Sequence, residues 1–216
     1  IFKQKIKGKP LIYLDSANSS QKPKVVIDKI SNFYETEFSN VGRSVHTLAV
    51  KATNRFEATR DKVQKYLNAK HREEIIFTKG ATEAINLVAS SYGKKYIKKG
   101  DEILITELEH HSNYVPWNFL RTEKGAVIKF AQVNESGDVE IEEIKKLITN
   151  KTKMIAITHI SNVTGAVLPI TKIVDLAKEK NIPVLIDGTQ GAPHSKIDMQ
   201  KIGCDFYAIS CHKMYG

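Results

Sequence analysis

The sequence has few cysteines and no long apolar run. Cys204 and Cys211 are its only cysteines among 216 residues, which is too few for a disulfide framework and fits a reducing environment. No stretch approaches the roughly 18 consecutive apolar residues of a membrane-spanning helix, and the first ten residues lack the apolar core of a signal peptide. We therefore expect a soluble protein without a membrane partner. The chain starts with Ile1 rather than Met. The sequence therefore does not decide whether a targeting segment comes before it, or which compartment the protein occupies.

Clustered basic charge is also lacking, although the total charge is high. The 33 Lys and Arg against 24 Asp and Glu give a net charge of +9. The lysines are spread along segments such as YGKKYIKKG and EEIKKLITNKTK and do not form one block with aromatic residues. This spacing is typical of solvated helix faces, so we expect no nucleic-acid partner. No C-x-x-C or H-x-x-x-H pair is present, so no metal site is expected.

From residue 73 onward, short apolar runs alternate with amphipathic stretches. The runs are rich in Ile and Val and are bounded by Gly, Asp or Pro, which is typical of strands. They are EIIFT, DEILIT, AVIKFAQV, KMIAITHI, IPVLIDG and DFYAIS. The intervening segments TEAINLVASSYGKKYI and ITKIVDLAKEK have helical periodicity. The pattern predicts an α/β fold with a mostly parallel, doubly wound sheet and flanking helices on both faces.

Helical periodicity also predicts which faces are apolar. One predicted stripe lies on ITKIVDLAKEK and consists of Ile170, Ile173, Val174 and Ala177. Residues 21–70 predict two helices, and the apolar face of the second would consist of Ala52, Phe56, Val63, Tyr66 and Leu67. We divide the chain into an N-terminal arm (1–20), a helical segment belonging to the arm or to a small domain (21–70), and a large α/β domain (71–216).

A phosphate site is predicted where the first strand passes into a helix, since ligands of open α/β sheets bind beyond the carboxyl ends of the strands. In EIIFTKGATEAINLV the predicted strand ends at Thr78 and a helix starts near Thr82 after Gly80. Backbone N–H groups, the helix dipole and the Thr82 hydroxyl would together hold a phosphate. An ordinary glycine turn with a threonine cap is the alternative.

Polar side chains close the next two strands. In ITELEHHSNYVPW, the adjacent His110 and His111 would point in different directions, which argues against a chelating pair. A single imidazole at this place can instead stack on an aromatic ligand ring. The segment AITHISNVTG brings His159, Ser161 and Asn162 to the following strand end. The alternative for each histidine is an ordinary polar loop residue.

A carboxylate and a lysine close the last two strands. Asp187 ends the apolar run VLID, where a buried carboxylate is costly unless cations or donors face it, and Gln190 can point to the same ligand. Lys213 follows DFYAIS beside Ser210 and His212, and a desolvated lysine there can form a Schiff base with an aldehyde cofactor. A turn cap is the alternative for Asp187. A phosphate cradle, stacking histidine, buried acid and lysine are the contacts that pyridoxal 5′-phosphate needs.

Seven segments carry a resemblance that covers essentially the whole chain. They are YLDSANSSQKP, VHTLAVKAT, FTKGATEAINLVA, TELEHHSNYVPW, ITHISNVTG, VLIDGTQ and DFYAISCHKMYG. In this order they resemble the group II (SufS-type) cysteine desulfurases of the class V aminotransferase family. The resemblance implies the type I fold of the transferases that depend on pyridoxal 5′-phosphate.

The resemblance also implies a role for each site residue. Lys213 would bind the cofactor aldehyde and act as the catalytic base, Asp187 would pair with the pyridine nitrogen, and His110 would stack on the ring as a second catalytic residue. Asn162 and Gln190 would contact the region of the phenolic oxygen. The phosphate would be held by Ala81, Thr82, Ser210 and His212.

The implied activity is conversion of L-cysteine to L-alanine, with sulfur leaving as a persulfide for iron–sulfur cluster assembly. A homodimer, a SufE-like acceptor or SUF scaffold complex, and a bacterial cytoplasm or plastid-type organelle such as an apicoplast follow from the same resemblance. Two alternatives stay open. One is a selenocysteine lyase or another enzyme of this family, and the other is a non-catalytic basic binding module.

Three positions depart from the family pattern. Gly42 stands where a histidine is usual, Asn18 where a small residue is usual, and Cys211 where glycine is common. The resemblance places the sulfur-accepting cysteine and the arginine that binds the substrate carboxylate beyond Gly216. We therefore expect residues 1–216 to be inactive alone, and Cys204 and Cys211 to be core or near-core residues.

Overall fold

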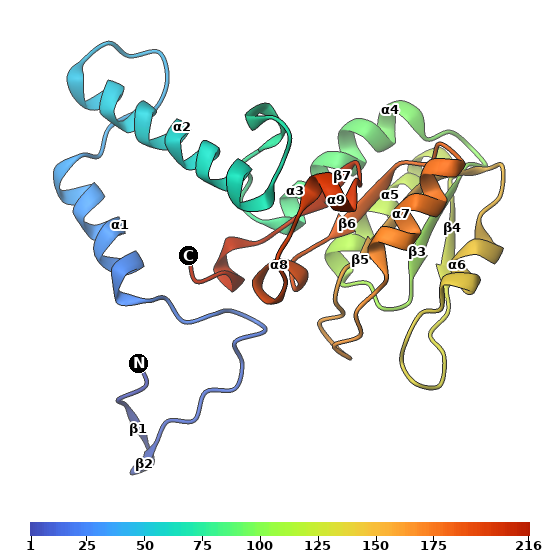
Figure 1. Ribbon diagram of the computed structural model, residues 1–216, viewed down its shortest axis with the longest axis horizontal. Helices are drawn as coiled ribbons and strands as arrows, with labels where there is room; N and C mark the ends of the chain where they lie inside the picture. Colours follow the sequence, from blue (N-terminus) through green and yellow to red (C-terminus); the bar gives the residue numbers. More distant parts are fainter.

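The computed structural model describes all residues from 1 to 216, and it shows an α/β fold (Figure 1). Five parallel strands form one sheet in the order β4-β3-β5-β6-β7. Their bounds are β3 Glu102–Thr106, β4 Val127–Ala131, β5 Thr152–Thr158, β6 Val184–Asp187 and β7 Phe206–Ala208. The predicted parallel sheet is confirmed for these five strands.

The register of the sheet aligns the ends of three strands. Thr158 at the end of β5 lies opposite Asp187 at the end of β6, and Asp187 lies opposite Ala208 at the end of β7. The strand order reverses between β3 and β5, because the chain adds β4 on one side of β3 and then returns to add β5 on the other. Open α/β sheets bind ligands beside such a reversal, at the carboxyl edge.

Helices cover both faces of the sheet and create two hydrophobic clusters. One face carries α3 Ala81–Val88, its continuation through the π-helical turn η2 Ala89–Gly93 and α4 Lys94–Tyr96, and α5 Val115–Lys124. The other face carries α6 Ile141–Leu147, α7 Ile170–Glu179 and α9 Met199–Ile202. The predicted stripe of α7 is confirmed, because all four of its residues are buried.

Short elements complete the carboxyl edge and the N-terminal region. Near the edge lie the single-turn 3₁₀ helices η3 His111–Asn113 and η4 Cys211–Lys213 and the short helix α8 Gly191–His194. A third 3₁₀ turn, η1, spans Arg72–Glu74, and a two-stranded antiparallel ribbon pairs β1 Lys5–Ile6 with β2 Lys9–Pro10. None of the helices combines the length and the apolar character needed to cross a bilayer.

The segment EIIFT does not form the predicted strand. Residues 72–74 make the turn η1, and residues 75–78 run without strand pairing. Ile75 is buried in the core. The sheet nevertheless ends at β7, and residues 75–78 do not pair with it as a further strand. An apolar run can therefore satisfy the strand pattern and still lack the ladder hydrogen bonds that define a strand.

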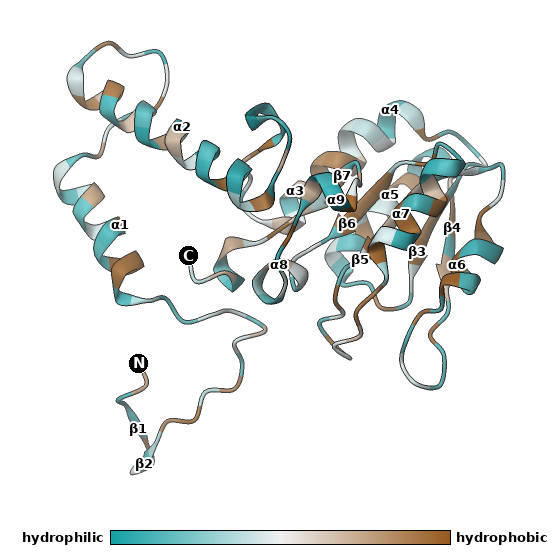
Figure 2. Cartoon of the chain, in the orientation of Figure 1, coloured by the Kyte–Doolittle hydropathy of each residue, from teal (hydrophilic) through white to brown (hydrophobic).

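Two helices precede the sheet, as the periodicity of residues 21–70 predicts. They are α1 Lys24–Thr36, which buries no residue, and α2 Thr47–Leu67. Both carry apolar residues on exposed surfaces, and α2 extends away from the sheet (Figures 1 and 2). On the predicted apolar face of α2, Ala52 and Leu67 are buried and Phe56 packs edge-on against Phe77, with ring centroids 5.1 Å apart. Tyr66 is 57% exposed, so the prediction is wrong there. Only the end of α2 near Leu67 packs into the main core of the α/β region.

Candidate active site

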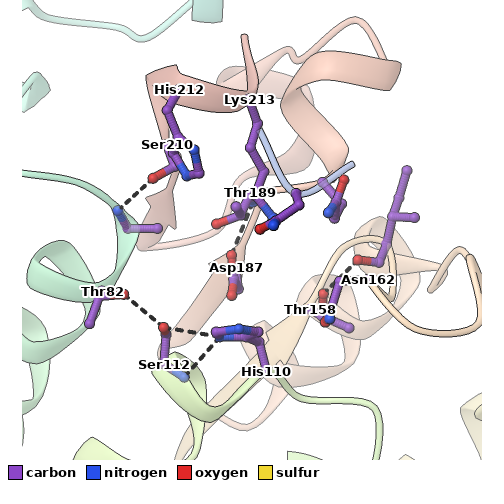
Figure 3. A pocket seen from close by; sticks show the side chains of 14 residues that line it. Thr82, His110, Ser112, Thr158, Asn162, Asp187, Thr189, Ser210, His212 and Lys213 are labelled. Atoms are coloured by element: carbon purple, nitrogen blue, oxygen red, sulfur yellow. Dashed lines mark hydrogen bonds between the residues drawn. The ribbon is translucent and has the colours of Figure 1, made fainter. Parts of the chain in front are cut away.

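A polar cavity of about 210 Å³ lies at the carboxyl edge of the sheet (Figure 3). Residues from β5, β6, α3 and five other segments line it, and only two of the fourteen are hydrophobic. The lining residues are Asn18, Ala81, Thr82, His110, Ser112, Thr158, Ile160, Asn162, Asp187, Thr189, Gln190, Ser210, His212 and Lys213. All nine residues predicted to bind a cofactor are among them, so the structure brings the whole predicted set together.

One wall of the cavity is formed by the N-terminus of α3. The Ala81 N–H donates to Ser210 Oγ over 3.2 Å, and the Thr82 and Ser112 hydroxyls lie 2.7 Å apart. Gly80 has a φ of +153°, and a Cβ there would lie 3.0 Å from Ser210 Oγ. Glycine therefore lets the chain turn into the helix close to Ser210. Hydroxyls and a helix N-terminus at one wall suit an anionic group such as a phosphate.

His110 and Ser112 form the neighbouring part of the cavity. The Ser112 N–H donates to His110 Nδ1 over 3.1 Å, and Ser112 Oγ lies 3.0 Å from the same nitrogen. Because Nδ1 accepts the backbone hydrogen bond, the proton of the neutral ring is on Nε2. Figure 3 shows the His110 ring beside Ser112 and below Asp187. The ring orientation is thus set by the backbone turn η3.

Asp187 and Lys213 point into the cavity from opposite sides (Figure 3). Asp187 is only 4% exposed, and its Oδ1 accepts a hydrogen bond from the Thr189 N–H over 3.0 Å. Desolvation lowers the pKa of Lys213, while the negative charges of Asp187 and Asp15 partly oppose this effect. The pKa of His212 is also lowered, first by desolvation and then by the charges of Lys213 and Lys22. These shifts favour a neutral amine and a neutral imidazole.

The cavity fits a ligand with an anion at one end and a cationic ring nitrogen at the other. The hydroxyls and helix N-terminus lie on the α3 side, and the Asp187 carboxylate lies at the end of β6. The hydroxyl of Thr189 is buried and has no hydrogen-bond partner within the protein. Buried polar groups are nearly always satisfied, so this hydroxyl indicates a ligand or solvent partner inside the cavity.

A half-buried carboxylate, that of Glu109, supports the cavity from behind. Glu109 Oε1 accepts from the Thr106 hydroxyl over 2.6 Å and from the Thr158 N–H over 2.9 Å, and Oε2 accepts from the Asn113 amide over 2.6 Å. Desolvation raises the pKa of Glu109 to about 7 despite these hydrogen bonds, and the charge of Asp187 adds to the rise. The carboxylate thereby joins β3, β5 and the turn next to His110.

The strand-end residues His159 and Ser161 do not line the cavity, in contrast to Asn162. His159 is buried behind it, with Nδ1 2.8 Å from the Tyr207 hydroxyl. Burial lowers the pKa of His159 and raises that of Tyr207. A Cβ on Gly191 would lie 2.2 Å from His159 Nδ1, so α8 can pack on this pair only through a glycine.

Sequence reasoning missed four lining residues, which are Ser112, Thr158, Ile160 and Thr189. Three of them carry hydroxyls and lie within two residues of a predicted site residue or a strand end. This proximity is the signal that could have found them. Glu109 was missed as well, although it directly precedes His110 and a glutamate after an apolar strand is unusual enough to be noticed.

The two cysteines differ in environment. Cys204 packs against the core, and desolvation raises the pKa of its thiol to about 12. Cys211 is exposed on the turn η4, so the prediction that it is a core or near-core residue is wrong. The turn faces the cavity with Lys213, which leaves Cys211 on the outside.

Comparison with known proteins shows the same family along the chain. The family model described as "Aminotransferase class-V" matches residues 12–216. A probable cysteine desulfurase of Halalkalibacterium halodurans is 47% identical over 216 residues, covering all of this chain and 53% of that protein. A cysteine desulfurase of Synechococcus elongatus is 43% identical, covering all of this chain and 34% of that protein. The chain thus spans about half the length, or less, of the curated relatives it matches.

Solved structures agree with these sequence relatives. The crystal structure of the cysteine desulfurase CsdA (S-sulfonic acid) from Escherichia coli superposes with a TM-score of 0.86 at 38% identity, covering 94% of this chain and 51% of that one. The apo structure of a cysteine desulfurase from Thermococcus onnurineus NA1 has a TM-score of 0.89 at 34% identity, covering 94% and 50%. The predicted α/β fold is confirmed by both.

Proposed function

The chain belongs to the class V aminotransferase family, whose cofactor is pyridoxal 5′-phosphate, and we propose that its cavity serves a cysteine desulfurase. The reaction would convert L-cysteine to L-alanine and pass the sulfur on as a persulfide. The observation that carries this proposal is the placement of Lys213 and Asp187 in one polar cavity, facing each other. A reactive amine and a buried acid are the two groups that the chemistry of this cofactor requires.

The residues of the cavity would hold the cofactor by its two ends. Ala81, Thr82, Ser210 and His212 would bind the phosphate. Asp187 would pair with the ring nitrogen. His110 would lie against the ring, and Asn162 and Gln190 would contact its phenolic oxygen. The unpaired Thr189 hydroxyl is placed to join them.

Bound pyridoxal 5′-phosphate supplies an aldehyde that condenses with amines and a ring that spreads developing negative charge. Within the protein, Lys213 Nζ would take the proton from the substrate Cα and later return a proton there. Its lowered pKa raises the neutral fraction that can accept a proton. Asp187, held by the Thr189 N–H, would stabilise positive charge at the ring nitrogen.

Neither cysteine of residues 1–216 takes the sulfur in this proposal. The Cys204 thiol has a pKa of about 12 and lies near the start of β7, at the opposite edge from the cavity. Cys211 is exposed on η4 and does not line the cavity. The sulfur acceptor has to ionise and has to reach the cavity; the raised pKa of Cys204 opposes the first, and Cys211 does not meet the second.

The resemblance of TELEHHSNYVPW to group II enzymes supports a finer proposal. On this basis the protein would act in iron–sulfur cluster assembly of the SUF type, as a homodimer that passes sulfur to a SufE-like acceptor or scaffold complex. A bacterial cytoplasm or a plastid-type organelle would be the compartment. The bacterial relatives support the first of these two.

Borohydride reduction of the full-length protein tests the proposal. Protein loaded with pyridoxal 5′-phosphate should have a visible absorption band that L-cysteine alters, and reduction should fix the cofactor on Lys213. Peptide mapping locates the adduct. A Lys213→Ala variant should lose the adduct, whereas Lys24→Ala, an exposed lysine on α1, should retain it. An adduct on any other lysine would overturn the assignment.

A further inference from the structure

The turn that carries Lys213 has little support of its own. It is the single 3₁₀ turn η4, and none of residues 211–216 is buried. Its internal hydrogen bonds are few: Lys213 N–H donates to Ser210 O, and the N–H groups of Met214 and Gly216 donate to Cys211 O. A single 3₁₀ turn with so few internal hydrogen bonds does not by itself hold a side chain in one direction. Something outside the turn has to supply the order.

Residues 17–22, which we call the N-terminal strap, supply that support. The carbonyl oxygen of His212 accepts hydrogen bonds from the Ser20 N–H at 3.1 Å, from Ser20 Oγ at 3.0 Å and from Lys22 Nζ at 2.7 Å. Ser20 Oγ also accepts from the Tyr215 N–H at 2.8 Å. Every hydrogen bond from residues 211–216 to a distant part of the chain goes to Ser19, Ser20 or Lys22.

The other end of the strap is attached to a second residue that lines the cavity. Gln190 Nε2 donates to the Ala17 carbonyl over 2.8 Å, and Asn18 lines the cavity between the two attachments. The strap therefore runs from the start of α8 to η4. Ser20 itself is only 6% exposed, although most of the N-terminal region is exposed. Ser20 is buried, and several donors converge on the His212 carbonyl. The contact is therefore more than an attachment at the surface.

We propose that Ser20 and Lys22 are positioning residues for Lys213. Ser20 binds the backbone on both sides of the lysine, at His212 and Tyr215, so it limits rotation of the turn about Lys213. Lys22 adds a charge-assisted hydrogen bond to the carbonyl directly before Lys213, and such bonds are stronger and shorter than neutral ones. The strap thus holds the Lys213 side chain toward Asp187. This inference rests on the proposed function for the role of Lys213, but the contact itself does not.

Hydrogen exchange of the full-length protein without cofactor tests the contact. Lys22→Met and Ser20→Ala should speed amide exchange in residues 213–216 by about tenfold, the loss expected from one strong hydrogen bond. Lys22→Arg, which keeps the charged donor, should restore slow exchange. Lys24→Met is the matched control, because Lys24 lies two residues away and only pairs with Asp28 at the surface. Unchanged exchange in both Lys22→Met and Ser20→Ala would overturn the proposal.

Cofactor release tests the positioning. With pyridoxal 5′-phosphate bound, Lys22→Met and Ser20→Ala should release it about tenfold faster than the unaltered protein. Lys22→Arg and Lys24→Met should release it at the unaltered rate. Faster exchange without faster release would show a structural attachment only and would overturn the positioning role. Attachment of the cofactor to a lysine other than Lys213 in the unaltered protein would instead refute the proposed function, and the exchange result would still decide whether the strap orders the turn.

Discussion

The N-terminal region, residues 1–70, and the α/β region, residues 71–216, use their apolar residues differently. In the α/β region six of the seven residues of β5 and all four of β6 are buried. In the N-terminal region α1 buries nothing, and α2 buries only Ala49, Ala52 and Leu67 among 21 residues. Apolar side chains on α1 such as Val25 and Ile30 are 71% and 55% exposed. The two regions therefore differ in packing, although both have amphipathic helices.

This difference separates the part of the chain that stabilises the fold from the part that positions the residues of the cavity. The two hydrophobic clusters of the α/β region hold the sheet, and the sheet aligns the strand ends that form the cavity. The N-terminal region adds almost no core there, yet its strap donates hydrogen bonds next to Lys213. We infer that burial builds the cavity and that polar contacts from the exposed region adjust it.

The largest effect is expected from the buried carboxylate of the α/β region. Asp187→Asn should lower turnover of the full-length enzyme by a hundredfold or more, roughly the loss seen when one preorganised electrostatic group is removed. The neutral amide cannot balance a positive ring nitrogen. The measurement is cysteine-dependent formation of alanine, with circular dichroism to check folding. Asp15→Asn in the exposed N-terminal region is the control and should cost less than about tenfold, because solvent screens an exposed charge. Near-normal turnover of Asp187→Asn would mean that Asp187 serves only as a turn cap.

Core substitutions test the packing difference directly. Ile173→Ala on α7 should lower the free energy of unfolding by about 3 kcal/mol, because it leaves a cavity in a fully buried position. Ile30→Ala on α1 should lower it by less than about 0.5 kcal/mol, because its side chain is already exposed. Urea denaturation of the 216-residue chain gives both values. Equal losses would show that α1 is packed in solution and would remove the distinction between the regions.

Glu109 provides a pH test with a defined sign. Its folded-state pKa of about 7 lies above the ordinary value of 4.5, so the folded protein holds its proton more tightly than the unfolded chain. The stabilisation is present in full below pH 4.5 and is lost as the pH rises through 7. Between pH 5 and 8 the loss should be on the order of 2–3 kcal/mol.

Glu109→Gln should remove most of this dependence, as measured by urea denaturation at several pH values. Glu57→Gln on α2 is the matched control, since Glu57 is partly exposed and pairs with Arg72 at the surface. It should leave the pH dependence of the unaltered protein intact. If Glu109→Gln and the unaltered protein had parallel pH profiles, the Glu109 carboxylate would be solvated.

The smallest effect is expected from the two cysteines. In the full-length enzyme the double change Cys204→Ala and Cys211→Gly should preserve persulfide formation from cysteine, at a stability cost of about 1 kcal/mol. Persulfide labelling and peptide mapping after one turnover measure the site of the sulfur. Label on Cys211 that disappears with activity in the variant would mean that the exposed thiol on η4 is the sulfur carrier.

Much of the site could be predicted from the order of residues alone. In a parallel sheet all strands end at one edge, so His110, Asp187 and Lys213 meet there even though they are far apart in sequence. Thr82 reaches the same cavity from the first turn of α3, although the strand predicted before it does not form. Burial of the α7 stripe followed from helical periodicity in the same way. These predictions hold because the repeat of a strand or a helix fixes the direction of its side chains.

Other features were decided by tertiary packing. The apolar run Ile75–Thr78 has strand composition but pairs with no strand, and Tyr66 has the helical phase of an apolar face but is 57% exposed. Local periodicity predicts which face of an element is apolar. It does not predict whether another helix or strand packs against that face. Pairing and burial depend on distant partners, which only the assembled structure supplies.

The sequence by itself determined the parallel α/β sheet and the set of residues gathered at its edge. The tertiary structure alone decided how those residues are held: Glu109 joins Thr106, Thr158 and Asn113, and Ser20 binds the His212 carbonyl 192 positions away. The physical reason is that alternation and periodicity are local properties, written in neighbouring residues. A hydrogen bond is satisfied only when a donor and an acceptor come within about 3 Å, and that distance is set by the packing of the whole chain.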